Sequence, residues 1–270
     1  MEISRIGIIT HPEVEKNIVL DTVKKLRKKG VSLCFDPRTA EKMGVKATET
    51  KGMDVDLAII LGGDGTLLWS VNELRGSPLI LGINTGRIGY LTELGVHNHI
   101  ENIEKIFSGE FFIDERSKLR VNNKYDVLNE LVIMPQRPAS LLEFRISLNN
   151  EKITEFRADG VLVSTQTGST GHALSLGGPI IHPEAGVYQI MPMVSFMQEQ
   201  PPLIVPDTSR TEIEFLGKKK DAYMILDGNV IKKIKHTEKV AVQKSKNTVR
   251  FVRFSKKKWK PKITDSGYLN

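Results

Sequence analysis

The stretch Leu61-Gly62-Gly63-Asp64-Gly65-Thr66 sets the expectation for the first half of this 270-residue chain. A near-continuous apolar run at residues 56–61 predicts a buried strand that ends at the first glycine, and helical spacing follows at residues 66–74. Three glycines around one aspartate leave a turn of bare backbone, so its N–H groups and the positive end of the helix can approach phosphate oxygens. The stretch therefore predicts a phosphate site in an α/β domain.

This phosphate site has a carboxylate, Asp64, at its centre. It lacks the lysine of a P-loop, because Gly65-Thr66-Leu67 does not supply Gly-Lys-Ser/Thr. The alternative is an ordinary tight turn in which Asp64 caps the helix. A cap needs no glycine on both sides, which favours the phosphate site.

Outward from this turn, apolar runs and helical spacing alternate through residue 115. Strands are expected at residues 5–10, 31–35, 56–61 and 78–83, and helices at residues 13–29, 66–74 and 99–107. Strands separated by helices predict a Rossmann-like parallel sheet with right-handed crossovers, whose ligands bind at the carboxyl ends of the strands.

Beyond residue 115 the pattern changes to short apolar runs between turn signals, which predicts a β-rich domain of the β-sandwich type. Its strands are expected at residues 118–121, 126–135, 142–148, 160–164, 203–205, 211–215, 223–226, 239–242 and 249–254. We therefore predict an α/β, phosphate-binding domain over residues 1–115 and a β-rich domain over residues 116–250. The C-terminal segment 251–270 is expected to pack back on the first domain.

The composition is that of a globular protein, with 40% hydrophobic and 26% charged residues, which excludes disorder as the main state. The single cysteine, Cys34, excludes a disulfide framework and a cysteine-built zinc site. No run approaches the roughly 18 apolar residues of a membrane-spanning helix, and the N-terminus lacks the pattern of a signal peptide. We therefore expect no membrane association and a cytoplasmic location.

The net charge of +7 arises in one region, residues 218–262, which holds 14 Lys and 2 Arg against three acidic residues. The rest of the chain is net acidic. Because few aromatic residues are interleaved with these cations, we do not expect nucleic acid as a partner. A solvated basic face and attraction of a polyphosphate ligand are the two interpretations of this region.

Gly-Gly-Asp-Gly-Thr is the signature of a superfamily that contains NAD kinases, diacylglycerol and sphingosine kinases and, more distantly, 6-phosphofructokinases. Five further blocks resemble the NAD kinases, in the same order along nearly the whole chain. They are residues 82–91, residues 128–133 with their Asn-Glu pair, residues 157–179, Leu226-Asp227-Gly228 and residues 250–254. The chain is therefore identified as a member of the NAD kinase family.

The resemblance implies an enzyme that transfers a phosphoryl group to the 2′-hydroxyl of the adenosine ribose of NAD, giving NADP. The donor is ATP, another triphosphate or polyphosphate, used with Mg²⁺ or another divalent cation. Asp64 is expected to orient the hydroxyl and accept its proton, while Gly62, Gly63, Gly65 and Thr66 hold the donor phosphates. No residue is assigned as a metal ligand.

The resemblance also assigns the residues that bind NAD. They are Tyr90, Asn129, Glu130, Arg157, Asp159, Thr167, Thr170, Gly171, His172, Ser175 and Asp227. Asp227 is expected near the transferred phosphate or its metal. Asp159 is expected to reach the nicotinamide side across a subunit interface, which implies a homodimer or a homotetramer.

The Asn129-Glu130 pair also has a physical interpretation of its own. Both residues lie inside the strand expected at residues 126–135, where neighbours project to opposite faces, so one of them must be buried or face a ligand. A buried structural hydrogen-bond pair is the alternative. Residues 165–171 are nearly all small and hydroxylated, so a nucleotide can lie against their backbone.

Three departures from the family pattern bear on the NAD side. His172 stands where members usually carry tyrosine, Gln166 where many carry proline, and residues 195–197 where many carry histidine and arginine. A histidine still stacks on a nucleotide, with less area and with a titratable ring. These departures leave the nicotinamide-side contacts and the preference for NAD or NADH open.

Two other functions fit parts of the sequence. A lipid kinase shares the glycine turn but needs a greasy groove or a membrane-facing surface, for which Trp259 in the basic run 256–262 is the nearest candidate. An NAD-binding regulator without activity would keep the NAD-binding residues and lose Asp64, which is present. We therefore rank NAD phosphorylation first, the lipid kinase second and the regulator third.

Overall fold

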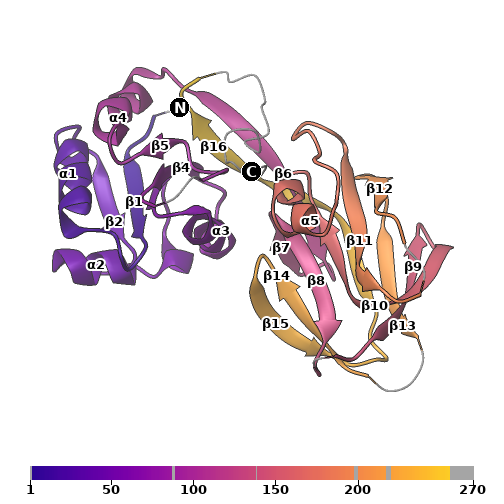
Figure 1. The fold of residues 1–270 in the computed structure, drawn as a ribbon. Coiled ribbons are helices and arrows are strands. Elements are labelled where there is room, and N and C mark those ends of the chain that lie inside the picture. Colours follow the sequence, from indigo (N-terminus) through magenta and orange to yellow (C-terminus); the bar gives the residue numbers. More distant parts are fainter. Residues whose placement is uncertain (1, 87–88, 138, 198–199, 217–219, 256–270) are drawn as a thin grey trace, which may run out of the picture. The chain divides into compact units, whose positions relative to one another are not determined.

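The computed structural model of this chain describes residues 2–86, 89–137, 139–197, 200–216 and 220–255. It divides into two compact units, most of whose elements are labelled in Figure 1. Within the described ranges, unit 1 comprises the chain up to Glu115 and from Val249, and unit 2 comprises Arg116–Thr248. Most of the C-terminal segment expected to pack on the first domain, residues 256–270 with Trp259, lies outside the described residues.

Unit 1 is built on a parallel sheet. Strands β1 (Arg5–Thr10), β2 (Ser32–Phe35), β3 (Leu57–Leu61) and β4 (Leu79–Asn84) pair in parallel in the order β2-β1-β3-β4. The short β5 (Leu94–Gly95) and the last part of β16 (Val240–Arg253) also pair in parallel with β4. Every residue of β3 is buried, as expected for a parallel strand covered on both faces, and this is why it stands out in the sequence.

The helices of unit 1 connect these strands. The predicted ones are α1 (Lys16–Arg27), α3 (Asp64–Glu73) and α4 (His99–Ser108). The sequence did not predict α2 (Pro37–Met43), because seven residues are too few for a helical period to show. Its start depends instead on the Asp36 side chain, which accepts the N–H of Thr39 at 3.1 Å. A 3₁₀ turn, Thr50–Gly52, completes the unit. Among the described residues, no helix is long and apolar enough to cross a membrane.

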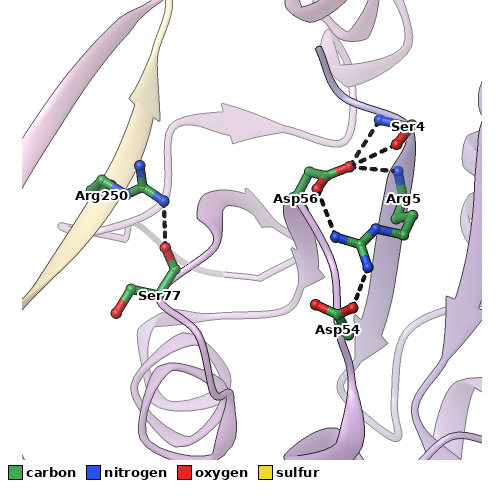
Figure 2. A network of polar contacts seen from close by, with 6 residues as sticks. All are labelled: Ser4, Arg5, Asp54, Asp56, Ser77 and Arg250. Carbon is green, nitrogen blue, oxygen red and sulfur yellow. Dashed lines mark hydrogen bonds and ion pairs between the residues drawn. The ribbon is translucent and has the colours of Figure 1, made fainter. Parts of the chain in front are cut away.

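A polar network ties the amino-terminal ends of β1 and β3 together (Figure 2). One Asp56 carboxylate oxygen accepts the backbone N–H groups of Ser4 at 3.0 Å and Arg5 at 2.8 Å, and the Arg5 guanidinium pairs with Asp54 and Asp56. These donors lower the pKa of Asp56 to about 2, the backbone N–H of Ser4 first. The network therefore fixes the edge of the sheet opposite to the carboxyl ends of its strands.

A second contact in the same figure joins Arg250 of β16 to the Ser77 carbonyl at 2.5 Å. Next to it, Arg250 and Phe251 continue the sheet beyond β4. The described start of the C-terminal segment is therefore part of the unit 1 sheet.

Unit 2 is an antiparallel β domain. Its strands are β6 (Phe112–Val121), which begins in unit 1, β7 (Tyr125–Val127), β8 (Glu130–Pro135), β9 (Leu142–Leu148), β10 (Glu151–Ser164), β11 (Val187–Ser195), β12 (Leu203–Pro206), β13 (Thr211–Leu216), β14 (Ala222–Leu226), β15 (Asn229–Ile234) and the first part of β16. The first half of β10 pairs with β9 and its second half with β8, while β11 pairs along the other edge.

The main hydrophobic core of unit 2 is formed by side chains from many of these strands. It contains Ile133 of β8, Phe144 of β9, Met224 of β14 and Val242 of β16, all fully buried. A smaller cluster on the other face of β8, β10 and β11 packs against Ala173 of the short helix α5 (His172–Ser175). Unit 2 therefore confirms the strand-rich second half predicted from the sequence.

Some strand predictions were wrong in detail. Residues 239–242 and 249–254 belong to one continuous strand, β16, and β11 and β15 were not predicted. β11 contains Gln189 and Pro192, which interrupt its apolar pattern. β15 carries Lys232 and Lys233 and is mostly exposed, so it gives no apolar signal.

Candidate active site

The glycine turn of unit 1 joins β3 to α3. The first bond inside the helix runs from the Leu67 N–H to the Gly63 carbonyl at 3.1 Å, so the N–H groups of Asp64, Gly65 and Thr66 precede it and face the open end of the helix. A Cβ at Gly63 or Gly65 would meet no atom within 4 Å. The backbone on both sides of Asp64 is therefore open to a ligand.

Gly62 has a different part in the turn. A Cβ there would lie 2.7 Å from the Thr66 hydroxyl oxygen, closer than such atoms approach one another. Glycine is needed at this position because the Thr66 side chain packs back on the backbone. Gly62 therefore shapes the turn, and Thr66 lines the space in front of it.

The Asp64 carboxylate is held by a second loop of the same unit. Its Oδ2 accepts the Tyr90 N–H at 2.7 Å and its Oδ1 accepts the Leu91 N–H at 3.1 Å. A Cβ at Gly89 would lie 2.9 Å from Oδ1 and 2.2 Å from the Thr92 hydroxyl oxygen. The block at residues 82–91, which resembles the NAD kinases in sequence, is thus joined to the glycine turn through Asp64, and Tyr90 lies beside that carboxylate.

A pocket of about 580 Å³ opens at the glycine turn, next to the carboxyl ends of β1, β3 and β4. This is the edge at which ligands bind in parallel α/β sheets. Its lining consists of His11, Glu13, Val14, Arg38, Gly63, Gly65, Thr66, Trp69, Thr85 and Gly86. Three of the four residues predicted to hold donor phosphates, Gly63, Gly65 and Thr66, are therefore brought to one pocket.

Among the pocket residues that sequence reasoning missed are three large polar or aromatic side chains, those of His11, Arg38 and Trp69. His11 directly follows β1, a position that the rule on strand ends could have found. Arg38 lies on the unpredicted helix α2, and Trp69 lies on α3 among apolar neighbours that resemble core positions. No local signal marks those two.

In unit 2, the segment that holds Asn129 and Glu130 is clamped by Asp227. The Asp227 carboxylate accepts the N–H groups of Leu128 at 2.8 Å, Asn129 at 2.7 Å and Glu130 at 3.0 Å. The chain therefore leaves the strand pattern between β7 and β8. The prediction that both residues lie inside one strand over 126–135 was wrong, because three backbone N–H groups turn to the carboxylate.

Asp227 is buried, with a φ of 45° just after β14. Both of its carboxylate oxygens accept hydrogen bonds from backbone N–H groups. The role that these bonds indicate for Asp227 is to position Asn129 and Glu130. Its predicted place near the transferred phosphate or a metal stays a prediction.

Three buried side-chain oxygens, in the segment held by Asp227 and in the loop of small residues, receive no hydrogen bond within the described part of the chain. They are Asn129 Oδ1, Glu130 Oε2 and Thr167 Oγ1. Such atoms cost free energy unless a ligand or water satisfies them. Burial, with a smaller contribution from Asp227, raises the pKa of Glu130 to about 7. A buried, perturbed carboxyl of this kind marks a candidate binding site.

The loop of small residues lies directly on this segment. The Thr165 N–H donates to the Asn129 carbonyl at 2.9 Å, and a Cβ at Gly168 would lie 2.3 Å from the same oxygen. A Cβ at Gly171 would lie 3.7 Å from Glu130 Oε2. Gly171, between the 3₁₀ turn Gly168–Thr170 and α5, therefore lies beside the Asn-Glu pair. The other predicted residues of this segment are Thr167, Thr170, His172 and Ser175, of which His172 and Ser175 are exposed.

The structure does not bring Arg157 and Asp159 to the same place. Ser164 is the residue of β10 that pairs with Glu130, and Asp159 lies five residues before it, or roughly 16 Å along a strand. Arg157 and Asp159 are exposed, and the Arg157 guanidinium lies 5.2 Å from the centre of the Phe196 ring. These two residues form a second, separate group in unit 2.

Models of two protein families match the chain. The ATP-NAD kinase N-terminal domain matches residues 6–111, and the ATP-NAD kinase C-terminal domain matches residues 128–254. The NAD kinase of Methanosphaera stadtmanae is 36% identical over 93% of this chain and 95% of its own length. The NAD kinase of Methanothermobacter thermautotrophicus is 33% identical and covers 97% of each chain.

Solved structures share the fold. The crystal structure of an NAD kinase from Archaeoglobus fulgidus in complex with ATP has a TM-score of 0.78, with 23% identity over 93% of both chains. The crystal structure of yeast NADH kinase complexed with NADH has a TM-score of 0.87, with 20% identity over 95% of this chain and 85% of that one.

Proposed function

This chain belongs to the NAD kinase family, and we propose that it transfers the terminal phosphoryl group of a triphosphate to the 2′-hydroxyl of the adenosine ribose of NAD, giving NADP. The observation that carries this proposal is the Asp64 carboxylate, fixed by two backbone N–H groups between two glycines that line a pocket. A carboxylate held beside free backbone donors suits phosphoryl transfer to an alcohol.

The donor side belongs to unit 1. The N–H groups at the start of α3 and the Thr66 hydroxyl supply hydrogen bonds to phosphate oxygens, and the helix dipole adds positive potential there. The open space beside Gly63 and Gly65 lets the phosphates approach the backbone. Gly62 contributes by allowing the Thr66 side chain to pack.

Asp64 orients the attacking hydroxyl and accepts its proton late in the reaction. Because the transition state of phosphoryl transfer is loose, positioning and charge neutralisation supply most of the rate. Each carboxylate oxygen has a second lone pair, so the bonds from Tyr90 and Leu91 leave acceptor capacity for the substrate. The same two bonds fix the direction of that capacity.

The acceptor side belongs to unit 2. The unpartnered oxygens of Asn129, Glu130 and Thr167 accept from the amine and hydroxyl donors of the adenosine half of NAD. Thr170, Gly171, His172 and Ser175 line the same place. Satisfying buried oxygens on binding contributes affinity, because each is unsatisfied in the free protein.

The described residues contain no group of three or more histidine, cysteine or acidic side chains that could cage a metal. Mg²⁺ is commonly held by one or two carboxylates and by substrate phosphates, with water completing its shell. Asp64, beside the phosphate pocket, fits such a single-carboxylate role. A divalent cation bound with the triphosphate would neutralise charge on the donor oxygens.

Arg157 and Asp159 serve a neighbouring subunit in this proposal, so the active species is a homodimer or homotetramer. Their support is exposure and their distance along β10 from the strand position of Glu130. An isologous interface would place two active sites across one two-fold axis, each with an Asp159 from the partner.

Subunit complementation tests the shared site. An inactive Asp64→Asn chain is mixed with an inactive Asp159→Ala chain under conditions that allow exchange. A hybrid dimer would contain one site with both changes and one with neither, so activity should partly return. No recovery despite demonstrated exchange, or a fully active monomer in sedimentation, would refute sharing and leave the kinase proposal standing.

The activity itself is tested by NADP formation from NAD with ATP and Mg²⁺, measured against a panel of donors. Diacylglycerol serves as the control acceptor, since a lipid kinase shares the glycine turn. NADP formation with no phosphorylated lipid supports the proposal. Phosphorylation of the lipid alone, or no NADP with any donor, would refute it.

A further inference from the structure

Part of the unit 1 pocket is not needed to hold phosphates. Its volume, about 580 Å³, is in the range of pockets that take whole small-molecule ligands, roughly 300–1,000 Å³. The groups suited to phosphate, Gly63, Gly65 and Thr66, lie at the start of α3. Trp69 lies five residues beyond Asp64, which is roughly 7.5 Å further along the helix axis. The pocket therefore extends from the phosphate turn toward a large aromatic side chain.

Arg38 of α2 lies over that side chain. Its guanidinium carbon is 5.3 Å from the centre of the Trp69 ring, within reach of a cation–π contact. Arg38 is exposed, and no carboxylate lies within ion-pair distance of its guanidinium in the part of the chain that the structure describes. Trp69 is half-buried and is not a member of the main buried core cluster of the unit.

Other charged groups of the pocket do not change this picture. Glu13 is exposed and lies 4.0 Å from the His11 ring nitrogen. Lys42 donates to the carbonyls of Pro12 and Val14, and these bonds fix the loop that carries His11 and Glu13. The Arg38–Trp69 pair is therefore the planar, polarisable surface of a pocket whose walls are held in place.

We propose that Arg38 and Trp69 form a stacking platform for the base of the donor, so the donor is a nucleoside triphosphate in preference to inorganic polyphosphate. This inference rests on the proposed function. Bases stack on aromatic rings and on guanidinium planes, and such stacking tolerates changes in base identity because every base has a π-face. ATP and GTP should therefore be used with similar efficiency, and inorganic triphosphate less well.

Fluorescence tests binding at the platform without activity. The chain has two tryptophans, so a Trp259→Phe variant leaves Trp69 as the sole indole reporter. ATP and GTP should quench Trp69 emission saturably. Inorganic triphosphate should displace ATP but leave the emission unchanged. Quenching by NAD and not by ATP, or equal quenching by all three phosphates, would overturn the proposal.

Kinetics tests the contribution of the platform to donor use. Trp69→Leu should raise KM for ATP by about 10- to 100-fold, the usual effect of losing one stacked base, with KM for NAD unchanged. Trp69→Phe should recover most of that loss. Arg38→Gln should raise KM for ATP less, and Arg27→Gln, an exposed arginine on α1, serves as the matched control with no change.

An unchanged KM for ATP in Trp69→Leu would overturn the platform while NADP formation continued. Failure of the proposed function is a different result, because the unmodified protein would then form no NADP. The fluorescence titration still reports on base binding in that case. The two failures are therefore distinguishable.

Discussion

The turn around Asp64 in unit 1 and the turn around Asp227 in unit 2 use the same device to different ends. In each, one aspartate accepts backbone N–H groups from a segment far along the chain: Tyr90 and Leu91 for Asp64, and residues 128–130 for Asp227. Asp64 lies half-exposed between glycines that line a pocket, whereas Asp227 is buried.

Hydrogen bonds to a carboxylate therefore do not by themselves identify its role. Asp64 keeps acceptor capacity on a side that a substrate can reach, because its neighbours have no side chains. Asp227 is enclosed, so the same kind of bonds make it a support for Asn129 and Glu130. Exposure separates the catalytic candidate from the positioning one.

The largest expected effect comes from Asp64. Asp64→Asn should lower kcat by roughly 10²- to 10⁴-fold, because the amide cannot act as a general base. Its stability should change by only about 1 kcal/mol, since one of two backbone bonds is lost at a half-exposed site. Steady-state kinetics and urea unfolding measure the two effects. Asp21→Asn on α1 is the control, and a kcat within about threefold of the parent would remove Asp64 from catalysis.

Replacing Asp227 should reduce stability strongly and kcat less, which is the reverse of the result expected for Asp64. Asp227→Ala leaves three buried N–H groups without their charged acceptor and should destabilise the protein by roughly 2–4 kcal/mol. KM for NAD should rise because Asn129 and Glu130 lose their support, with kcat reduced less than in Asp64→Asn. Urea unfolding with kinetics on the folded fraction checks this. Unchanged stability with a collapse of kcat would assign Asp227 to the chemistry.

Replacing Glu130 should change the binding of the acceptor, NAD, and not that of the donor. Glu130→Gln should raise KM for NAD by about tenfold and leave KM for the triphosphate nearly unchanged, since Glu130 is predicted to contact the acceptor only. Initial rates with each substrate varied in turn measure both constants. An effect confined to the triphosphate would mean that the two substrates are assigned to the wrong units.

The raised pKa of Glu130 also predicts a pH dependence of stability. Folding shifts this pKa from the ordinary 4.5 to about 7, so the folded state favours the protonated carboxyl. Stability should be greatest below pH 4.5 with respect to this group and should fall as the pH rises toward 7. Urea unfolding across this range should show the fall in the parent and a flatter profile in Glu130→Gln. Parallel profiles would contradict the burial of the carboxyl.

The smallest effect concerns Asp56, an aspartate that accepts backbone N–H groups far from either candidate site. Its folded pKa is lowered from 3.8 to about 2, so its stabilisation is present above pH 4 and is lost as the pH falls toward 2. Asp56→Asn should therefore lose less stability than the parent over that range. Asp54→Asn, which removes only an exposed pairing with Arg5, is the matched control. NADP formation should be unchanged in both variants.

The parallel sheet of unit 1 was predictable because its strands are buried on both faces. A short, near-continuous apolar run that ends at a glycine turn, such as residues 56–61, favours a buried strand. In unit 2, β15 is mostly exposed and β11 is interrupted by Gln189 and Pro192, so neither gives a pattern. Where a strand is exposed or carries polar residues or proline within its apolar run, its composition does not report its pairing.

The residues of the candidate site also divide into those that a short stretch of sequence indicates and those that it does not. Local composition indicated the glycine turn and the small-residue loop, because each needs special backbone or small volume in a short stretch, and the block at residues 82–91 was indicated by its resemblance to the NAD kinases. It did not indicate Arg38 and Trp69, which lie on different helices and are ordinary residues for a surface and a core. Their significance comes from being neighbours in a pocket.

The amino-acid sequence was sufficient to place the buried strands of unit 1, to locate the turn where glycine frees the backbone, and to identify the family. Only the tertiary structure decided that Asp227, 97 to 99 residues from its donors, interrupts the strand expected at residues 126–135. It also decided that Asp64 is fixed by a loop 26 residues away. The physical reason is that local patterns encode burial and backbone freedom, whereas a carboxylate accepts from whichever N–H groups the fold brings within 3 Å.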